Sequence, residues 1–137
     1  MDGHYDLRER VATVEEFQRL RDAAGMAARS GAGVERGLPN SVYGVVVGNE
    51  RSGETVGMGR IVGDDGSVYH IADTAVHPDH QRRGLGTAIM EVLLDYVTET
   101  APPNAYVNLM ADVDRFYERS GFEETRPASK GMYRRTE

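Results

Sequence analysis

A glycine-rich turn with two adjacent arginines separates a strand-like apolar run, which ends at Val76, from an amphipathic helical run. The turn consists of Gln81, Arg82, Arg83, Gly84, Leu85, Gly86 and Thr87. Glycines at a helix start let the backbone approach an anion closely, and the unpaired N–H groups of the first helical turn point toward that anion. The turn therefore predicts a cradle for a pyrophosphate, although an exposed connection between a strand and a helix could have the same sequence.

The composition limits the chemistry and the partners that the chain supports. Its 137 residues fit a single domain over residues 1–137. It has no cysteine, which excludes disulfides, a cysteine nucleophile and thiolate metal ligands. His77 and His80 are spaced like metal ligands, but no third ligand is evident, so we expect no metal site.

The charge and the hydropathy pattern predict where the protein works. Sixteen lysines and arginines against 22 acidic residues give a net charge of −6, so we expect no nucleic-acid partner. No apolar run approaches the roughly 20 residues that cross a bilayer. Residues 1–5 also lack the basic and then apolar pattern of a signal peptide. We therefore expect a cytoplasmic protein with no membrane partner.

The elements before the turn are predicted from periodicity and capping signals. Residues 5–10 alternate like an edge strand, and Thr13 with Glu16 forms a capping box that starts a helix. Residues 26–40 predict a mobile, partly helical lid, with a loose connector as the alternative. Strand-like runs with turn signals between them then predict an antiparallel meander over residues 42–47, 55–62 and 68–76.

The elements after the turn complete a mixed sheet. Apolar residues at helical spacing predict a helix that starts at Leu85 and that two prolines, 102 and 103, stop. Residues 104–109 then predict a strand parallel to residues 68–76, reached by a right-handed crossover. A short helix from Asp112 to Ser120 is expected next. The remaining residues predict a closing hairpin with strands over 122–125 and 132–135.

Two motifs in this order resemble those of the GNAT superfamily of acetyl-CoA-dependent N-acetyltransferases. The first is Gln/Arg-x-x-Gly-x-Gly/Ala after a strand, here residues 81–86, and the second is Phe-Tyr-x-x-x-Gly-Phe, here residues 116–122. The resemblance spans essentially the whole chain. It implies an α+β GNAT fold, in which an antiparallel meander and a parallel, splayed pair of strands form one central sheet flanked by helices.

The resemblance implies acetyl-CoA as the cosubstrate. In this family two parallel strands splay apart, and their unpaired backbone groups bind the pantetheine arm. Here these strands would end near Val76 and Leu109. A backbone N–H near Val76 would stabilise the oxyanion. The cofactor-binding residues that the resemblance implies are Ala75, Val76, Gln81, Arg82, Arg83, Gly84, Leu85, Gly86 and Thr87.

The catalytic residues that the resemblance implies are an acid and a base. Tyr117 occupies the position of the tyrosine that protonates the departing thiolate, with a core aromatic as the alternative. His70 and Asp73 are the candidates for the base on the strand before the turn. We favour His70, which shares its face with Val76 unless a bulge intervenes, whereas Asp73 lies on the opposite face. Both could instead be structural, with water removing the proton.

The function that follows is acetyl transfer to a primary amine of a small molecule by direct attack in a ternary complex. A non-catalytic sensor that binds acyl-CoA is the alternative. Many relatives carry asparagine and alanine where this chain has Ala111 and Val113, so one side-chain contact to the cosubstrate is expected to be missing. Relatives commonly dimerise, and the sequence neither requires nor excludes a homodimer.

Overall fold

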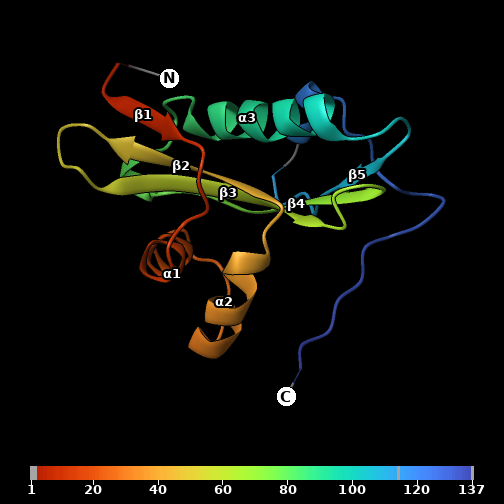
Figure 1. The fold of residues 1–137 in the computed structure, drawn as a ribbon, viewed down its shortest axis with the longest axis horizontal. Helices are drawn as coiled ribbons and strands as arrows, with labels where there is room; N and C mark the ends of the chain where they lie inside the picture. The colour runs from red at the N-terminus through yellow and green to blue at the C-terminus, as the bar shows by residue number, and fades with distance from the viewer. Residues whose placement is uncertain (1–2, 114, 137) are drawn as a thin grey trace.

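The structure is a computed structural model that describes residues 3–113 and 115–136. Its centre is one five-stranded sheet in the order β1-β2-β3-β4-β5 (Figure 1). The strands are β1 (Tyr5–Arg8), β2 (Tyr43–Asn49), β3 (Thr55–Gly63), β4 (Val68–Val76) and β5 (Tyr106–Asn108). Strands β1 to β4 run antiparallel to their neighbours, and β5 runs parallel to β4. The predicted meander and the predicted parallel return strand are confirmed, although β5 is shorter than residues 104–109.

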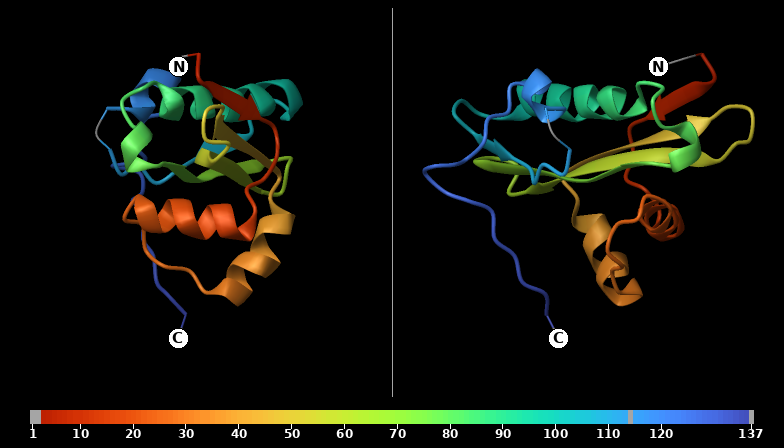
Figure 2. Two further views of the ribbon diagram at one scale, coloured as in Figure 1. Left: turned by 90° about the vertical axis from the view of Figure 1, so that its left-hand side faces the viewer. Right: turned by 180° about the vertical axis from the view of Figure 1, so that it is seen from behind.

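Helices cover both faces of the sheet, as an α+β fold requires. Helix α3 (Leu85–Thr100) lies on one face, whereas α1 (Val14–Ala23) and α2 (Gly31–Gly37) lie on the other (Figure 1, Figure 2). Short 3-10 turns are η1 (Leu38–Asn40), η2 (Pro78–His80) and η3 (Tyr117–Ser120). Within residues 3–113 and 115–136, no helix is long and apolar enough to cross a membrane.

An apolar core lies on each side of the sheet. Ile89 of α3 is fully buried in one core, and Phe17 of α1 is buried in the other. Val34 of α2 and the following Leu38 are buried in the same core as Phe17. Burying such a side chain stabilises a fold by about 1.5–3 kcal/mol. Residues 26–40 are therefore partly helical, as predicted, and pack onto α1 as part of the second layer.

The predicted capping box at the start of α1 is present and belongs to a larger polar network. The Thr13 hydroxyl accepts from the Glu16 N–H, and the Thr13 N–H donates to Glu16 at 2.8 Å. The buried Glu16 carboxylate also accepts from Arg10 at 2.8 and 2.9 Å and from the Thr55 hydroxyl. Hydrogen bonds from Arg10 are the main reason that the pKa of Glu16 lies far below its usual value. The network ties α1 to β3.

We expect Glu16→Gln to lower the free energy of unfolding by about 2 kcal/mol at pH 7, because charge-assisted bonds from Arg10 are lost. Since folding lowers the pKa of Glu16, its stabilisation is complete above the unfolded pKa of about 4.3 and fades as the pH falls below it. Urea unfolding from pH 7 down to pH 3 measures this difference. Glu15→Gln, at a pair with Arg19 that is largely exposed, is the control and is expected to change little. Equal effects of the two substitutions would contradict the prediction.

Strand β4 carries a β-bulge in its second half. Asp73 and Thr74 together lie opposite the single residue Gly59 of β3. Asp73 has a φ of 57°, in the left-handed region that non-glycine residues rarely adopt. An extra residue on one strand reverses the alternation of side chains beyond it.

The bulge changes which β4 side chains share a face. Ile71 and Val76 both pack against the α3 core, so His70, which neighbours Ile71, points to the α1 face. Asp73 also points to this face, where it contacts Arg21 of α1. The prediction that His70 shares a face with Val76, with Asp73 opposite, is therefore wrong. His70 and Asp73 lie together on the α1 face.

Strands β4 and β5 are paired only along the first part of β4. Residues 68–70 pair with residues 106–108, and β5 then ends at Asn108. From Ile71 to Val76, β4 pairs with β3 on one side. On its other side this stretch has no strand partner among the residues that the structure describes. This stretch is the open edge of β4, and it is the splay that the resemblance implied.

The C-terminal part of the chain differs from the prediction. The expected helix from Asp112 to Ser120 includes residue 114, which lies outside the described residues, and the structure shows only η3 there. The expected hairpin is absent, because the described residues from 121 to 136 contain no strand. The apolar side chains expected to close this hairpin are not buried, since Met132 and Tyr133 are more than four-fifths exposed. These residues instead run along the outside of the molecule (Figure 2).

Candidate functional site

Helix α3 begins with free backbone donors. Gly84 is the N-cap, and among the described residues no side chain accepts a bond from the first turn, which also holds no acidic residue. The N–H of Ala88 donates to the Gly84 carbonyl at 3.0 Å. The N–H groups of Leu85, Gly86 and Thr87 precede this bond and have no acceptor within the helix. With the positive end of the helix dipole, they suit an anion.

The backbone before α3 also has a conformation that suits an anion. Arg82 and Gly84 are both left-handed, with φ of 64° and 80°. Left-handed residues turn neighbouring N–H groups into a concave nest that binds anions. Such a conformation is strained for arginine and is typical of functional sites. The side-chain amide of Gln81 donates to the Val76 carbonyl at 3.0 Å and so holds the turn against the end of β4.

The open edge of β4 leads from this turn toward β5. The N–H of His77 donates to the Val56 carbonyl of β3 at 2.8 Å. Because successive N–H groups along a strand point to opposite sides, those of Val76 and Thr74 point away from β3, toward the open edge. Ala75, between them, is buried on the α1 face. The edge therefore offers backbone donors to an extended ligand.

Tyr117 lies beside the start of α3. A Cβ added to Gly86 would lie 3.7 Å from the ring of Phe116, which shows that the η3 segment packs against the first turn. Tyr117 and Asn108 of β5 line one open cavity of about 830 Å³. The Tyr117 hydroxyl donates to Asp112 at 3.1 Å. Burial, together with the Asp112 carboxylate, raises the pKa of Tyr117 to about 12, so the phenol is protonated at neutral pH.

His70 lies at the closed end of the splay. It is the last β4 residue paired with β5, and its ring Nδ1 contacts the side-chain oxygen of its pairing partner, Asn108. An amide oxygen only accepts hydrogen bonds, so Nδ1 carries the proton. The other ring nitrogen, Nε2, then holds a lone pair. This arrangement suits a base whose orientation is fixed by its neighbour.

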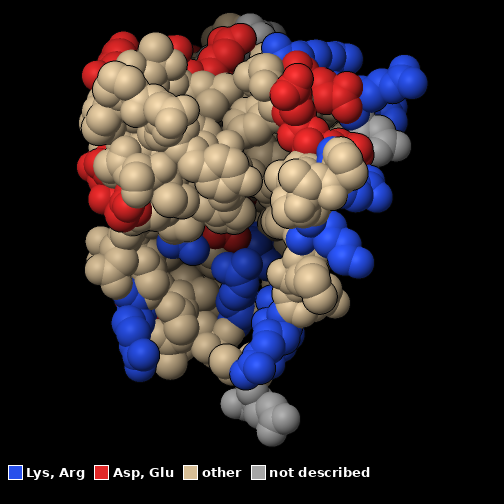
Figure 3. Space-filling view, turned by 90° about the vertical axis from the view of Figure 1, so that its right-hand side faces the viewer, with Lys and Arg blue, Asp and Glu red and all other residues tan. Residues whose placement is uncertain are grey.

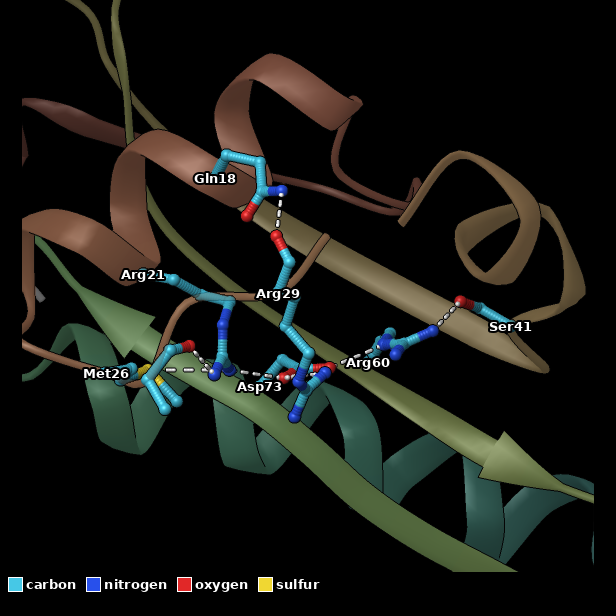
Figure 4. A network of polar contacts seen from close by, with 8 residues as sticks. Gln18, Arg21, Met26, Arg29, Ser41, Arg60 and Asp73 are labelled. Carbon is cyan, nitrogen blue, oxygen red and sulfur yellow. Dashed lines mark hydrogen bonds and ion pairs between the residues drawn. The ribbon is translucent and has the colours of Figure 1, made fainter. Parts of the chain in front are cut away.

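Asp73 lies in a cluster of arginines on the α1 face of the sheet (Figure 4). One carboxylate oxygen accepts from Arg21 at 2.7 Å, and the other accepts from Arg60 at the same distance. Arg29 approaches the first oxygen at 3.5 Å. The Asp73 side chain is only 3% exposed. Both of its oxygens therefore hold guanidinium groups within the fold.

The structure places the predicted residues along one strand and the turn that follows it. Val76 and residues 81–87 form the candidate anion cradle. His70 lies six residues back from Val76 along β4, a span of about 20 Å in an extended strand. Tyr117 lines the same cavity as Asn108, the pairing partner of His70. Asp73 lies between His70 and Val76, on the same face as His70.

Sequence reasoning missed the partners of these residues. Asn108 faces His70 only because of the register of a parallel pair, which the sequence does not specify. The arginines of the cluster come from α1, β3 and the segment before α2. One signal was available, because Arg21 follows Phe17 by four residues and Leu20 by one, so it lies on the apolar face of α1. An arginine there needs a buried partner.

Comparisons with known proteins identify the family of this chain. The sequence model of the acetyltransferase (GNAT) domain matches residues 33–132. An uncharacterised N-acetyltransferase from Porphyra purpurea is 29% identical over 120 residues, which cover 86% of this chain and 69% of that protein.

Solved structures show the same fold. A probable acetyltransferase of unknown function from meticillin-resistant Staphylococcus aureus is 34% identical, with a TM-score of 0.90 over 96% of this chain and 99% of that one. A GNAT family acetyltransferase from Brucella melitensis, solved in complex with acetyl-CoA, is 19% identical, with a TM-score of 0.66 over 89% of this chain and 84% of that one.

Proposed function

This chain belongs to the GNAT family of acetyltransferases, and we propose that it transfers an acetyl group from acetyl-CoA to a primary amine of a small molecule. The observation that carries the proposal is the uncapped start of α3 next to the open edge of β4. The first suits the diphosphate of CoA, and the second suits its extended pantetheine arm. Acceptor and acetyl-CoA would react directly in a ternary complex, since the chain has no cysteine to carry the acyl group.

The cosubstrate would lie along β4 with its thioester toward His70. Residues 82–87 would hold the diphosphate through backbone N–H groups and arginine charges. The arm would then run along the open edge, where the N–H groups of Val76 and Thr74 point. Thr74 is nearer to His70 than Val76 is, so its N–H is better placed to stabilise the oxyanion of the reacting carbonyl.

The reaction requires a base that removes a proton from the amine and an acid that donates a proton to the leaving thiolate. His70 Nε2 would accept a proton from the amine, whose nitrogen attacks the thioester carbon and forms a tetrahedral oxyanion. Collapse of this oxyanion breaks the carbon–sulfur bond, and Tyr117 would protonate the thiolate as it leaves. We assign the base to His70 rather than to Asp73, because arginines occupy both oxygens of the Asp73 carboxylate.

The proposal is tested by incubating the protein with acetyl-CoA and a panel of primary amines while free thiol is measured. Because the chain has no cysteine, every thiol detected comes from CoA. Amine-dependent release, with the acetylated amine identified by mass spectrometry, is the expected result. Tight binding of acetyl-CoA without release for any amine would instead indicate the non-catalytic sensor.

We expect His70→Gln to lower kcat/KM for the amine by about 100-fold at pH 7, the lower end of what general bases contribute. The substitution keeps the size and polarity of the side chain and removes the proton acceptor. His4→Gln, far along the chain, is the control. An unchanged kcat/KM in His70→Gln would assign proton removal to another group.

A further inference from the structure

Three arginines share a single carboxylate on the α1 face of the sheet. Asp73 is paired with Arg21, Arg60 and Arg29. Arg60 also donates to the Ser41 hydroxyl at 3.1 Å, and Figure 4 shows these groups converging from α1, β3 and the segment before α2. No other carboxylate within residues 3–113 and 115–136 is ion-paired with these arginines. One negative charge against three positive charges leaves an excess of two.

Two of the three arginines are largely removed from water. The side chains of Arg21 and Arg60 are 5% and 16% exposed, whereas that of Arg29 is 41% exposed. In addition, the buried Arg21 Nε has no hydrogen-bond partner among the described residues. Unmatched charge and unpaired donors are costly in a protein interior. An added anion beside Arg29 and Arg60 would offset part of this positive charge.

The electrostatics of Arg21 point the same way. Burial lowers the pKa of its guanidinium, and the positive charge of Arg29 lowers it further. The charge of Arg135, from the C-terminal segment, also lowers the pKa of Arg21, whereas Asp73 raises it. Lys and Arg side chains gather in the lower half of the face drawn in Figure 3. An anion beside Arg29 would relieve its repulsion with Arg21.

A small cavity adjoins the cluster. It has a volume of about 170 Å³ and is lined by Arg29, Arg60 and apolar side chains of α1, α2 and η1. The apolar members are Phe17, Val34 and Leu38. The volume equals about six water molecules at their liquid share of roughly 30 Å³, which admits a short chain and one small polar group. Paired guanidinium forks match the planar geometry of a carboxylate.

We propose that the acceptor is an aminocarboxylate, whose carboxylate binds Arg29 and Arg60 while its amine faces His70. This inference rests on the proposed acetyl transfer. Asp73 lies three residues from His70 along β4 and holds the arginines next to this strand. It therefore connects the carboxylate site with the base. Asp73 is thus a positioning residue for the carboxylate site. The apolar lining selects for methylene groups between the two ends of the acceptor.

The test compares ω-amino carboxylates of two to six carbons with their matching primary amides, by thiol release from acetyl-CoA. At least one carboxylate is expected to exceed its amide in kcat/KM by about 10- to 100-fold, the effect of one charge-assisted hydrogen bond. Arg60→Gln and Arg29→Gln are expected to remove most of this preference. Arg36→Gln, on α2 outside the cluster, is the matched control and is expected to keep it.

A second measurement separates this site from the transfer reaction. The melting temperature of the protein without acetyl-CoA is expected to rise with the preferred carboxylate and not with its amide, and the rise is expected to vanish in Arg60→Gln. Thiol release with equal use of acids and amides would overturn the carboxylate site and leave acetyl transfer standing. A melting shift that the parent protein shows and Arg60→Gln loses, with no thiol released for any amine, would overturn the transfer and support the site. A preference for phosphoethanolamine over every carboxylate would overturn the assignment to a carboxylate.

Discussion

Replacing Tyr117 with phenylalanine is expected to lower kcat by about 10²- to 10⁴-fold, the contribution of a general acid. The variant keeps the ring, which packs against the α3 core, and loses only the proton that would pass to the CoA thiolate. Burial, with help from Asp112, raises the pKa of Tyr117 to about 12. The acid therefore stays protonated across neutral and mildly alkaline pH, and the parent protein is expected to show no loss of activity from this group below about pH 10.

Stopped-flow detection of thiol measures kcat, and calorimetry measures acetyl-CoA affinity, which is expected to be nearly unchanged. Tyr133→Phe is the control, since Tyr133 is largely exposed in the C-terminal segment. If Tyr117→Phe turned over acetyl-CoA at the parental rate, the proton would have to come from water or from another side chain.

Replacing Thr87 with glutamate is expected to weaken acetyl-CoA binding by about 100-fold while it stabilises the protein. Thr87 is exposed in the first turn of α3, where a carboxylate interacts favourably with the helix dipole by about 0.3–1 kcal/mol. The same carboxylate would stand where the diphosphate of CoA is expected. At about 4 Å, like charges near a protein surface repel by up to about 4 kcal/mol.

Calorimetry and thermal unfolding measure the two effects on one sample. Thr87→Gln, which has the same shape without the charge, is expected to bind acetyl-CoA within about threefold of the parent protein. If Thr87→Glu and Thr87→Gln bound equally well, the diphosphate would lie elsewhere, and the cradle would lose its assigned role.

Much of the fold follows from local sequence patterns. The alternation in β2 to β4 and the apolar stripe of α3 each recur over many residues, so single exceptions do not obscure them. The capping box at Thr13 and the glycines before α3 have local physical causes and were likewise predictable. The candidate cradle is local in the same sense, because all of its groups are neighbours in the chain.

The parts that were missed depend on contacts between distant segments. The bulge at Asp73 adds one residue to a strand whose composition gives no sign of it, and that single residue places His70 and Val76 on opposite faces. The arginine cluster joins three segments that are far apart in the sequence. The expected C-terminal hairpin failed because its few apolar residues were not matched by a surface that could cover them.

The open edge of β4 also affects how the protein behaves without acetyl-CoA. Free N–H and C=O groups on a strand edge pair readily with strands of other chains, which is a common route to aggregation. From Ile71 onward β4 has such an edge, because β5 ends at Asn108. A bound pantetheine arm would shield it as a substitute strand. Purification with CoA present should therefore give more monodisperse material, since the recognition surface and the aggregation hazard consist of the same backbone groups.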